Sequence, residues 1–268
     1  MAARRCIRGA QPVTPVFMAE LSWPEFENKM EAGAPVFLPL GATEQHGPHL
    51  PLSVDIVLPT AVAEAVARQA GGIVAPAIPY GYKSQARSGG GQSFPGTTSL
   101  AAHTLSLVVR DVLYDLGSHG ARRFVVVNGH CENAWPAIEG IDLAMRELRR
   151  DGIADAKTMR LEYWDFVQPE TLAKIFPDGF PGIELEHASL LETSLMLLLR
   201  PDLVSPEKMP DDGPAEFPPY DLTPMPDGGV PESGVLAVAQ GASAEIGGWL
   251  MDDHVTLIAQ AVRREFGI

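Results

Sequence analysis

Two kinds of segment recur along the chain when its apolar and polar positions are followed from one end to the other. Short runs, most of them continuously apolar, predict buried strands over residues 35–40, 73–78, 124–127 and 157–161. Longer patterned segments predict helices over residues 59–70, 99–116, 135–149, 188–199 and 244–266. Strands that alternate with helices are typical of a mostly parallel sheet with helices on both faces. We therefore expect a three-layer α/β/α fold.

Proline and glycine mark the limits of these elements. Pro59 lies near the start of one predicted helix, and Gly71 and Gly72 follow its end. Residues 79–98 are rich in Gly, Ser, Gln and Pro and predict a long loop, and loops of that length are usually functional. Residues 205–233 are rich in proline and predict extended, irregular chain. No segment has the composition of a linker, so we expect a single domain over residues 1–268.

Composition narrows the class of protein. At 268 residues, with 46% hydrophobic and 20% charged positions, the chain is long enough for a sizeable core and is atypical of disorder. Its formal net charge of −14 makes nucleic acid and anionic membranes poor partners. Few cysteines, no signal-peptide pattern and no apolar run of ~18 residues indicate a cytoplasmic location. The glycine-rich motifs of dinucleotide-binding and P-loop proteins are absent.

Acidic and histidine side chains follow the first predicted strand. Glu44 and His46 are two residues apart, a spacing that in extended chain places both on one side. Asp55 follows eleven residues after Glu44 and could complete a site from a second loop. Carboxylate oxygen and imidazole nitrogen are common ligands of zinc and manganese. Alternatively, Glu44 is a surface residue, His46 a turn residue and Asp55 a charge at a helix N-terminus.

A second cluster follows the strand at 124–127. His130 and Glu132 repeat the two-residue spacing in reverse order, with Cys131 between them. Because ligands collect at the carboxyl ends of parallel strands, we expect this pair to meet the first cluster. Five ligands that include three carboxylates suit two metal ions sharing one carboxylate. A nucleophilic role for Cys131 is disfavoured because neighbouring acids oppose a thiolate.

Other candidate residues have both structural and functional interpretations. Glu186 and His187 precede a predicted helix that contains Glu192, and His187 is either a structural residue or a proton carrier. Trp164 is more often a core residue, and His49 a structural one. We expect three further histidines, in or near predicted helices, to face solvent: His103, His119 and His254.

Taken together, these motifs resemble those of the creatininase (creatinine amidohydrolase) family. The similarity covers nearly the whole chain and is carried by residues 41–49 with Asp55, by 128–133, 80–91, 94–100, 163–166, 186–187 and 192–196, and by 217–221. The resemblance implies an α/β/α fold, a homohexamer and two metal ions. It assigns Glu44, Asp55 and His130 to one ion, often manganese. It assigns His46, Asp55 and Glu132 to the other, typically zinc, with Asp55 as the bridge.

The resemblance also implies an activity, the reversible hydrolysis of creatinine to creatine by a hydroxide bound to both metals. We expect three catalytic residues: Glu132, Glu186 and His187. The expected substrate contacts are Ser88, Cys131, Trp164, Ile183, Glu184 and His187. His187 would carry the proton, and Trp164 would belong to a closing flap.

Three positions depart from the family pattern. The family has Tyr at position 131 and Trp-Asp at positions 183 and 184, where this chain has Cys131, Ile183 and Glu184. Loss of a Trp removes a large stacking surface for a ring. A hydrolase of another lactam or of a formamide, with the same metals, is therefore the main alternative. A non-catalytic ligand-binding relative is a further one, which the complete set of five ligands disfavours.

Overall fold

The computed structural model describes residues 15–220, 222–223 and 228–268. Four parallel strands form one sheet in the order β2-β1-β3-β4. The strands are β1 (Val36–Leu40), β2 (Ile73–Val74), β3 (Arg123–Asn128) and β4 (Lys157–Glu162). Leu40 pairs with Asn128, and Asn128 with Glu162, so three strands end at the same edge. The chain order reverses between β1 and β3, and ligands commonly bind at such a point in open α/β sheets.

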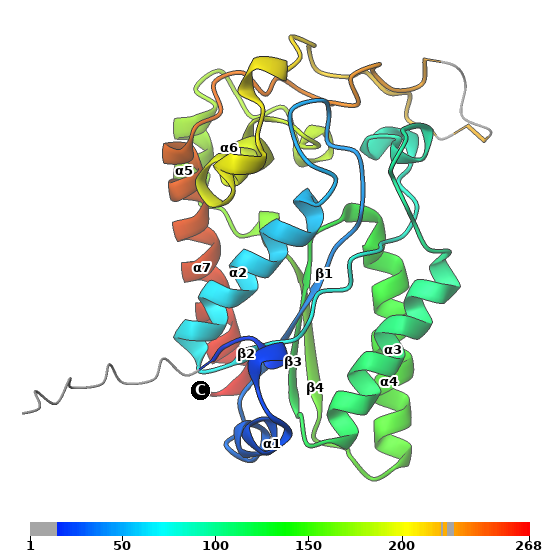
Figure 1. Cartoon of the computed structure of the whole chain (residues 1–268), viewed down its shortest axis with the longest axis vertical. Coiled ribbons are helices and arrows are strands. Elements are labelled where there is room, and N and C mark those ends of the chain that lie inside the picture. Colours follow the sequence, from blue (N-terminus) through cyan, green and yellow to red (C-terminus); the bar gives the residue numbers. More distant parts are fainter. Residues whose placement is uncertain (1–14, 221, 224–227) are drawn as a thin grey trace, which may run out of the picture.

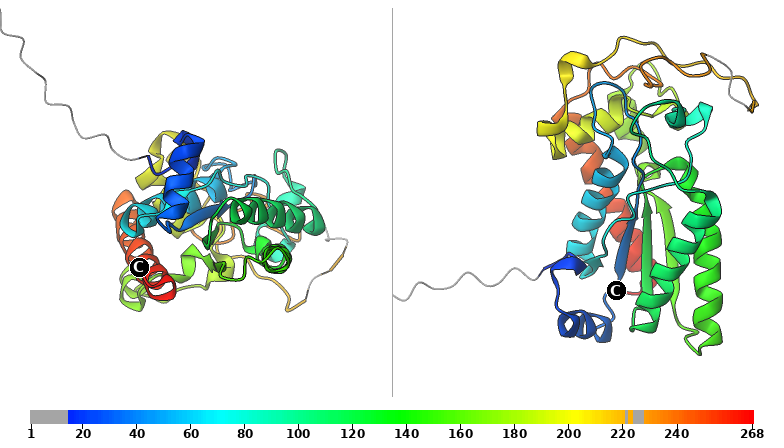
Figure 2. Two further views of the ribbon diagram at one scale, coloured as in Figure 1. Left: turned by 90° about the horizontal axis from the view of Figure 1, so that it is seen from below. Right: turned by 45° about the vertical axis from the view of Figure 1, so that its right-hand side comes forward.

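Helices cover both faces of the sheet and confirm the three-layer prediction (Figure 1). One layer contains α2 (Val54–Ala70), α6 (Leu190–Leu199) and α7 (Ala244–Phe266). The other contains α3 (Ala102–Ser118) and α4 (Ala134–Arg150), and the view from below in Figure 2 shows the sheet between the two layers. Each layer packs its own hydrophobic core against one face of the sheet. Phe37 belongs to the core under α2, α6 and α7, and its neighbours Val36 and Leu38 belong to the core under α3 and α4, because side chains alternate across a strand.

Two short helices were not predicted. They are α1 (Trp23–Glu31) and α5 (Pro169–Ile175). Each has only a narrow apolar side, with Phe26 and Met30 reaching the core from α1 and Leu172 and Ile175 from α5. Turns of 3₁₀-helix also occur in the connections, at Met18–Glu20, Ala86–Ser88, Gly91–Ser93, Cys131–Asn133, Tyr163–Asp165, Ile183–Leu185, Pro201–Leu203 and Pro206–Lys208.

The start of α2 was predicted too late. The helix begins at Val54 and includes Pro59 rather than starting beside it. Pro59 has no N–H to donate to the carbonyl of Asp55, so this turn of the helix lacks one bond. Because the helix begins at Val54, Asp55 lies in its first turn, where the macrodipole favours a carboxylate.

The predicted strand at 73–78 was too long. Regular pairing stops after Val74, and only a single bridge joins Ile78 to Leu40. Ala75 N still donates to Phe37 O, but Pro39 in β1 has no N–H to return to β2, which explains the early end. The described parts of 79–98 and 205–233 are irregular, as expected, apart from 3₁₀ turns and isolated bridges at Tyr82 and Thr98. Among the described residues, no helix is long and apolar enough to cross a bilayer.

The prediction that His254 faces solvent was wrong. Its side chain is 2% exposed, on the face of α7 that also buries Leu250 and Ile258, one turn to either side. His254 Nδ1 lies 3.0 Å from the carbonyl oxygen of Phe166 and donates to it, and the ring packs edge-on against Tyr163. The other two histidines, His103 and His119, are exposed as predicted.

The buried imidazole of His254 should make stability depend on pH. Burial lowers the pKa of His254 to about 4, so the folded protein holds the ring neutral. Its contribution is therefore complete above the unfolded pKa of about 6.5 and is lost as the pH falls toward 4. Between pH 7.5 and 5, we expect the wild type to lose about 2 kcal/mol more unfolding free energy than His254→Gln. Denaturant unfolding of both proteins with chelator present measures this; equal losses would contradict it.

Candidate metal centre and active site

The clustered acids and histidines come from four segments that meet at the carboxyl end of the sheet. The loop after β1 carries Glu44 and His46, and the first turn of α2 carries Asp55. The turn after β3 carries His130, and Glu192 lies in α6. The side chains of Glu44, His46, Asp55 and His130 are each at most 5% exposed, although all of them are ionisable. Burying such a group is costly unless a counter-charge is present.

Asp55 lies at the centre of this arrangement. Its Oδ1 is 3.0 Å from His46 Nε2, and its Oδ2 is 3.2 Å from His130 Nδ1. Glu44 Oε2 approaches the same His130 nitrogen at 3.0 Å. One carboxylate therefore presents its two oxygens to two different imidazoles, the arrangement expected of a ligand shared between two metal ions.

Backbone carbonyls fix the tautomers of both imidazoles. His130 Nε2 lies 2.9 Å from the carbonyl oxygen of Tyr82, and His46 Nδ1 lies 3.2 Å from that of Glu44. A carbonyl only accepts, so these nitrogens carry the hydrogens. In the neutral rings, the opposite nitrogens then point lone pairs at carboxylates. A cation between them removes that repulsion, and backbone bonds of this kind orient metal-bound histidines.

The histidines and carboxylates of the cluster also stabilise one another's charged forms. Burial opposes the charged form of His46 and His130, yet the surrounding carboxylates outweigh it and hold the pKa of each well above its ordinary value. Burial likewise opposes the charge of Asp55, and the two histidines outweigh it and lower the pKa of this acid. A divalent ion provides the same compensation and displaces the protons when it binds.

Unpaired polar atoms support a metal site. In the described part of the chain, four buried atoms of the cluster have no hydrogen-bond partner: Glu44 Oε1, His46 Nε2, Asp55 Oδ2 and Glu132 Oε2. Buried polar atoms are normally bonded, so such a concentration requires an explanation. All four are oxygen or imidazole nitrogen, the donors that zinc and manganese accept. These residues therefore fit divalent metal ions.

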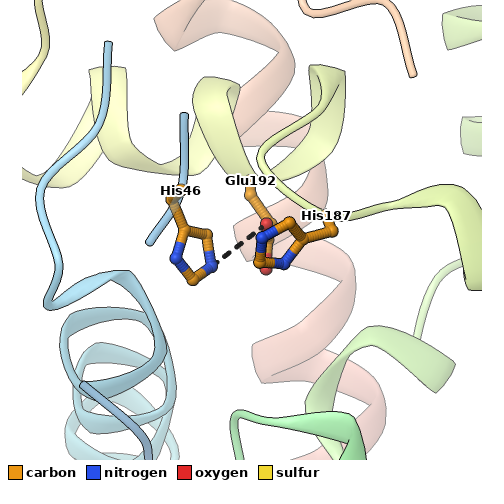
Figure 3. Close-up of side chains that lie close together, drawn as sticks. All are labelled: His46, His187 and Glu192. Atoms are coloured by element: carbon orange, nitrogen blue, oxygen red, sulfur yellow. Dashed lines mark ion pairs between the residues drawn. The ribbon is translucent and has the colours of Figure 1, made fainter. Parts of the chain in front are cut away.

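Two groups of side chains could each hold one ion. The first comprises Glu44, Asp55 and His130, as the resemblance implied. The second comprises His46, His187 and Glu192, whose ligand atoms lie within 4.8 Å of one another. Figure 3 shows these three side chains converging, with Glu192 Oε2 3.6 Å from His46 Nε2.

Glu132 lies apart from the second group. Its Oε1 accepts hydrogen bonds from the hydroxyl of Ser88 and from the backbone N–H of Gln85, at 2.7 Å for the latter. Its Oε2 lies 3.3 Å from His130 Nε2. Glu192 was not among the predicted ligands, although sequence analysis noted it beside Glu186 and His187. The sequence does not reveal that Glu192 lies near His46, because this contact depends on how α6 packs against the loop after β1.

A cavity of about 140 Å³ opens onto the cluster. All of the predicted substrate contacts line it: Ser88, Cys131, Trp164, Ile183, Glu184 and His187. Tyr163, Leu250 and His254 also line it, and sequence analysis did not select them for the site. The cavity adjoins a wider groove of about 990 Å³ and shares Ser88, Cys131 and Glu184 with it.

A family model described as creatinine amidohydrolase matches residues 19–262. The chain belongs to the creatininase family. It is 50% identical over 253 residues to creatinine amidohydrolase of Pseudomonas putida, covering 94% of this chain and 97% of that protein. It is 32% identical to the mycofactocin precursor peptide peptidase of Mycolicibacterium smegmatis, covering 85% of this chain and 84% of that protein.

Solved creatininase structures have the same fold. A crystal structure of creatinine amidohydrolase superposes with a TM-score of 0.93 at 48% identity, covering 95% of this chain and 99% of that one. A creatininase variant complexed with creatine superposes with a TM-score of 0.92, also at 48% identity, covering 95% of this chain and all of that one. Manganese and zinc forms of creatininase are among the similar structures.

Two ionisable groups at the cavity are held neutral. Burial, with the nearby charge of Glu192, raises the pKa of Glu186 to about 8, although Glu186 accepts hydrogen bonds from Leu191 N. Desolvation, with the charge of Glu132, raises the pKa of the Cys131 thiol to about 12. A protonated thiol is a poor nucleophile, which agrees with the prediction that Cys131 does not attack.

Proposed function

We propose that this protein is a metal-dependent amidohydrolase that opens the ring of creatinine to give creatine. The observation that carries the proposal is the buried cluster around Asp55, which opens onto a cavity sized for a small ring rather than for a folded chain. The 50% identity to a creatinine amidohydrolase over nearly the whole chain supports the substrate.

The residues divide into binding and catalytic roles. We assign one metal ion to Glu44, Asp55 and His130, and the other to His46 and Asp55 with Glu132 or Glu192. When bound, such ions supply Lewis acidity that activates a water and polarises the amide carbonyl. Zinc and manganese suit these ligands.

His187 is the proposed proton carrier. It is 8% exposed, lines the cavity, and lies against His46 with ring centroids 4.4 Å apart. Hydrolysis forms a carbon–oxygen bond and breaks the ring carbon–nitrogen bond, so a proton must move from water to the departing nitrogen. Glu132 and Glu186 are the other proposed catalytic residues. Trp164 would cover the ring from one side, and Ser88 would contact it through its hydroxyl.

Several finer features belong to the same proposal. We propose that residues 1–268 act as one catalytic domain, that the protein forms homohexamers and that it works in the cytoplasm. The family resemblance and the composition support these proposals.

One observation favours a second candidate. Cys131 and Ile183 line the cavity at positions where the family pattern has larger aromatic side chains, so less aromatic surface is available to cover a ring. A hydrolase acting on another lactam, or on a formamide, fits this change. Glu184 keeps a carboxylate at its position and favours substrates that carry hydrogen-bond donors.

Turnover of creatinine by the purified protein tests the proposal directly. We expect creatine to form, chelator to abolish the reaction, and added zinc or manganese to restore it, because the cluster loses its cations on chelation. Parallel assays with other lactams and formamides separate the two candidates. Two metal ions per chain without creatinine turnover would transfer the assignment to another amide.

A further inference from the structure

Gln45, between two of the proposed metal ligands, has no role so far. Its side chain is only 5% exposed and has defined polar partners. Its Oε1 lies 2.9 Å from the backbone N of Gly47. Its Nε2 lies 3.1 Å from the carbonyl oxygen of Gly89, 2.9 Å from that of Gly234 and 2.9 Å from Nε2 of His187.

The backbone partners determine which way this amide points. Two of them are carbonyls, which only accept, and the third is an N–H, which only donates. The amide nitrogen must therefore face Gly89 and Gly234, with the amide oxygen toward Gly47. The opposite orientation would place an oxygen against two oxygens and an NH₂ against an N–H. Three independent contacts thus assign the orientation of the amide.

This orientation determines the proton position on His187. The amide nitrogen of Gln45 has two hydrogens, which its three partners share, and no free lone pair, so it cannot accept. At 2.9 Å, Nε2 of His187 can meet it favourably only as an acceptor. The neutral ring then carries its hydrogen on Nδ1 and keeps the Nε2 lone pair directed at Gln45.

We propose that Gln45 is a positioning residue that holds His187 in the Nδ1–H tautomer, with Nε2 occupied by the amide and the Nδ1 hydrogen left for the reaction. The reaction step rests on the proposed function, whereas the tautomer does not. During hydrolysis, Nδ1–H of His187 gives its proton to the departing ring nitrogen as the carbon–nitrogen bond breaks, and Nδ1 takes up the proton that the attacking water releases. The amide of Gln45 occupies the Nε2 lone pair, so this exchange takes place at Nδ1 alone.

The surroundings leave the two side chains little freedom. Gly89 has φ = +110°, and a Cβ there would lie 2.6 Å from His187 Nε2. Gly234 has φ = +76°, and a Cβ there would collide with the amide of Gln45. His187 is also fixed by its own backbone, since its carbonyl accepts from Leu236 N at 3.2 Å. Gln45 therefore connects the loop at Gly89 and the segment at Gly234 to the proton carrier.

The test is nitrogen-15 NMR of histidine-labelled, zinc-loaded protein, which distinguishes the two neutral tautomers and requires no substrate. His187→Gln identifies the His187 signals by their loss. We expect the Nδ1–H tautomer in the wild type. In Gln45→Glu, a carboxylate that only accepts should draw the hydrogen to Nε2. With both metals retained, kcat on creatinine should fall about 10- to 100-fold while KM changes by less than about threefold.

Two further variants keep the test decisive. Gln45→Met retains the side-chain volume without the hydrogen bonds and replaces Gln45→Glu if that variant does not fold. We expect Gln45→Met to show mixed tautomers of His187 and a kcat about tenfold lower. Thr97→Val is the matched control, because Thr97 Oγ1 accepts only from the backbone N of Gln45, and it should keep the tautomer and kcat. A wild-type Nε2–H tautomer, or unchanged tautomer and kcat in Gln45→Met, would overturn the proposal. The expected tautomer without creatinine turnover would support it and reject the proposed substrate.

Discussion

Asparagine in place of Asp55 is expected to leave at most one metal ion per chain and to lower creatinine turnover by about three orders of magnitude. Each carboxylate oxygen of Asp55 faces a different histidine, and the residue is 3% exposed. An amide offers one neutral oxygen in place of two charged ones, so it cannot serve both sites. Metal analysis and steady-state kinetics measure the two effects.

The same substitution should remove stabilisation by metal. Added zinc should raise the melting temperature of the wild type, because ligands that bind only the folded state stabilise it, and should have little effect on Asp55→Asn. Glu64→Gln is the control on the same helix, since Glu64 lies in α2 but pairs only with Arg68 at 2.6 Å. Two bound ions and full turnover in Asp55→Asn would refute the shared-ligand role.

Removing the imidazole of His187 is expected to leave metal binding intact and to lower kcat by about 10²- to 10⁴-fold, the usual contribution of a positioned acid–base group. The proposed ligands Glu44, His46, Asp55 and His130 all remain in this variant. His187→Ala and the more space-filling His187→Gln should behave alike if proton transfer is the lost function. Metal content and kcat, measured together, check this.

Either of two results would change the role of His187. Full turnover in His187→Ala would exclude it as the proton carrier. Loss of one metal ion would instead place it among the ligands, because His187 lies in one group with His46 and Glu192. His103→Ala is a suitable control, since that histidine is exposed on α3.

Much of the fold was predictable because local pattern and tertiary burial agree. The strand around Val125 is apolar on both faces, and both faces are covered by helices. The helices α1 and α5 were missed because each buries few side chains and is held mainly by its neighbours. The beginning of α2 was misplaced because Pro59 suggested a first turn, whereas the helix tolerates it further in.

The site was predictable only in part, for a related reason. The chemistry of Glu44, His46, Asp55 and His130 is visible in their spacing after predicted strands. The approach of Glu192 to His46 and the contact between Gln45 and His187 are not, because they depend on how distant segments pack. The exposure of His254 was predicted wrongly because we gave its polar side chain more weight than its position on the same helix face as Leu250 and Ile258.

Assembly of the centre from four distant segments has a consequence for folding. Every strand pairing in the sheet is parallel and requires a crossover, so the chain must close long loops before its contacts form. Glu192 lies in α6, far along the chain from Glu44, and a nascent chain that ends before it cannot complete both metal groups. Metal uptake is thus a late event that reports a completed fold, and chelator present during refolding should leave the chain collapsed but more easily cut by proteases.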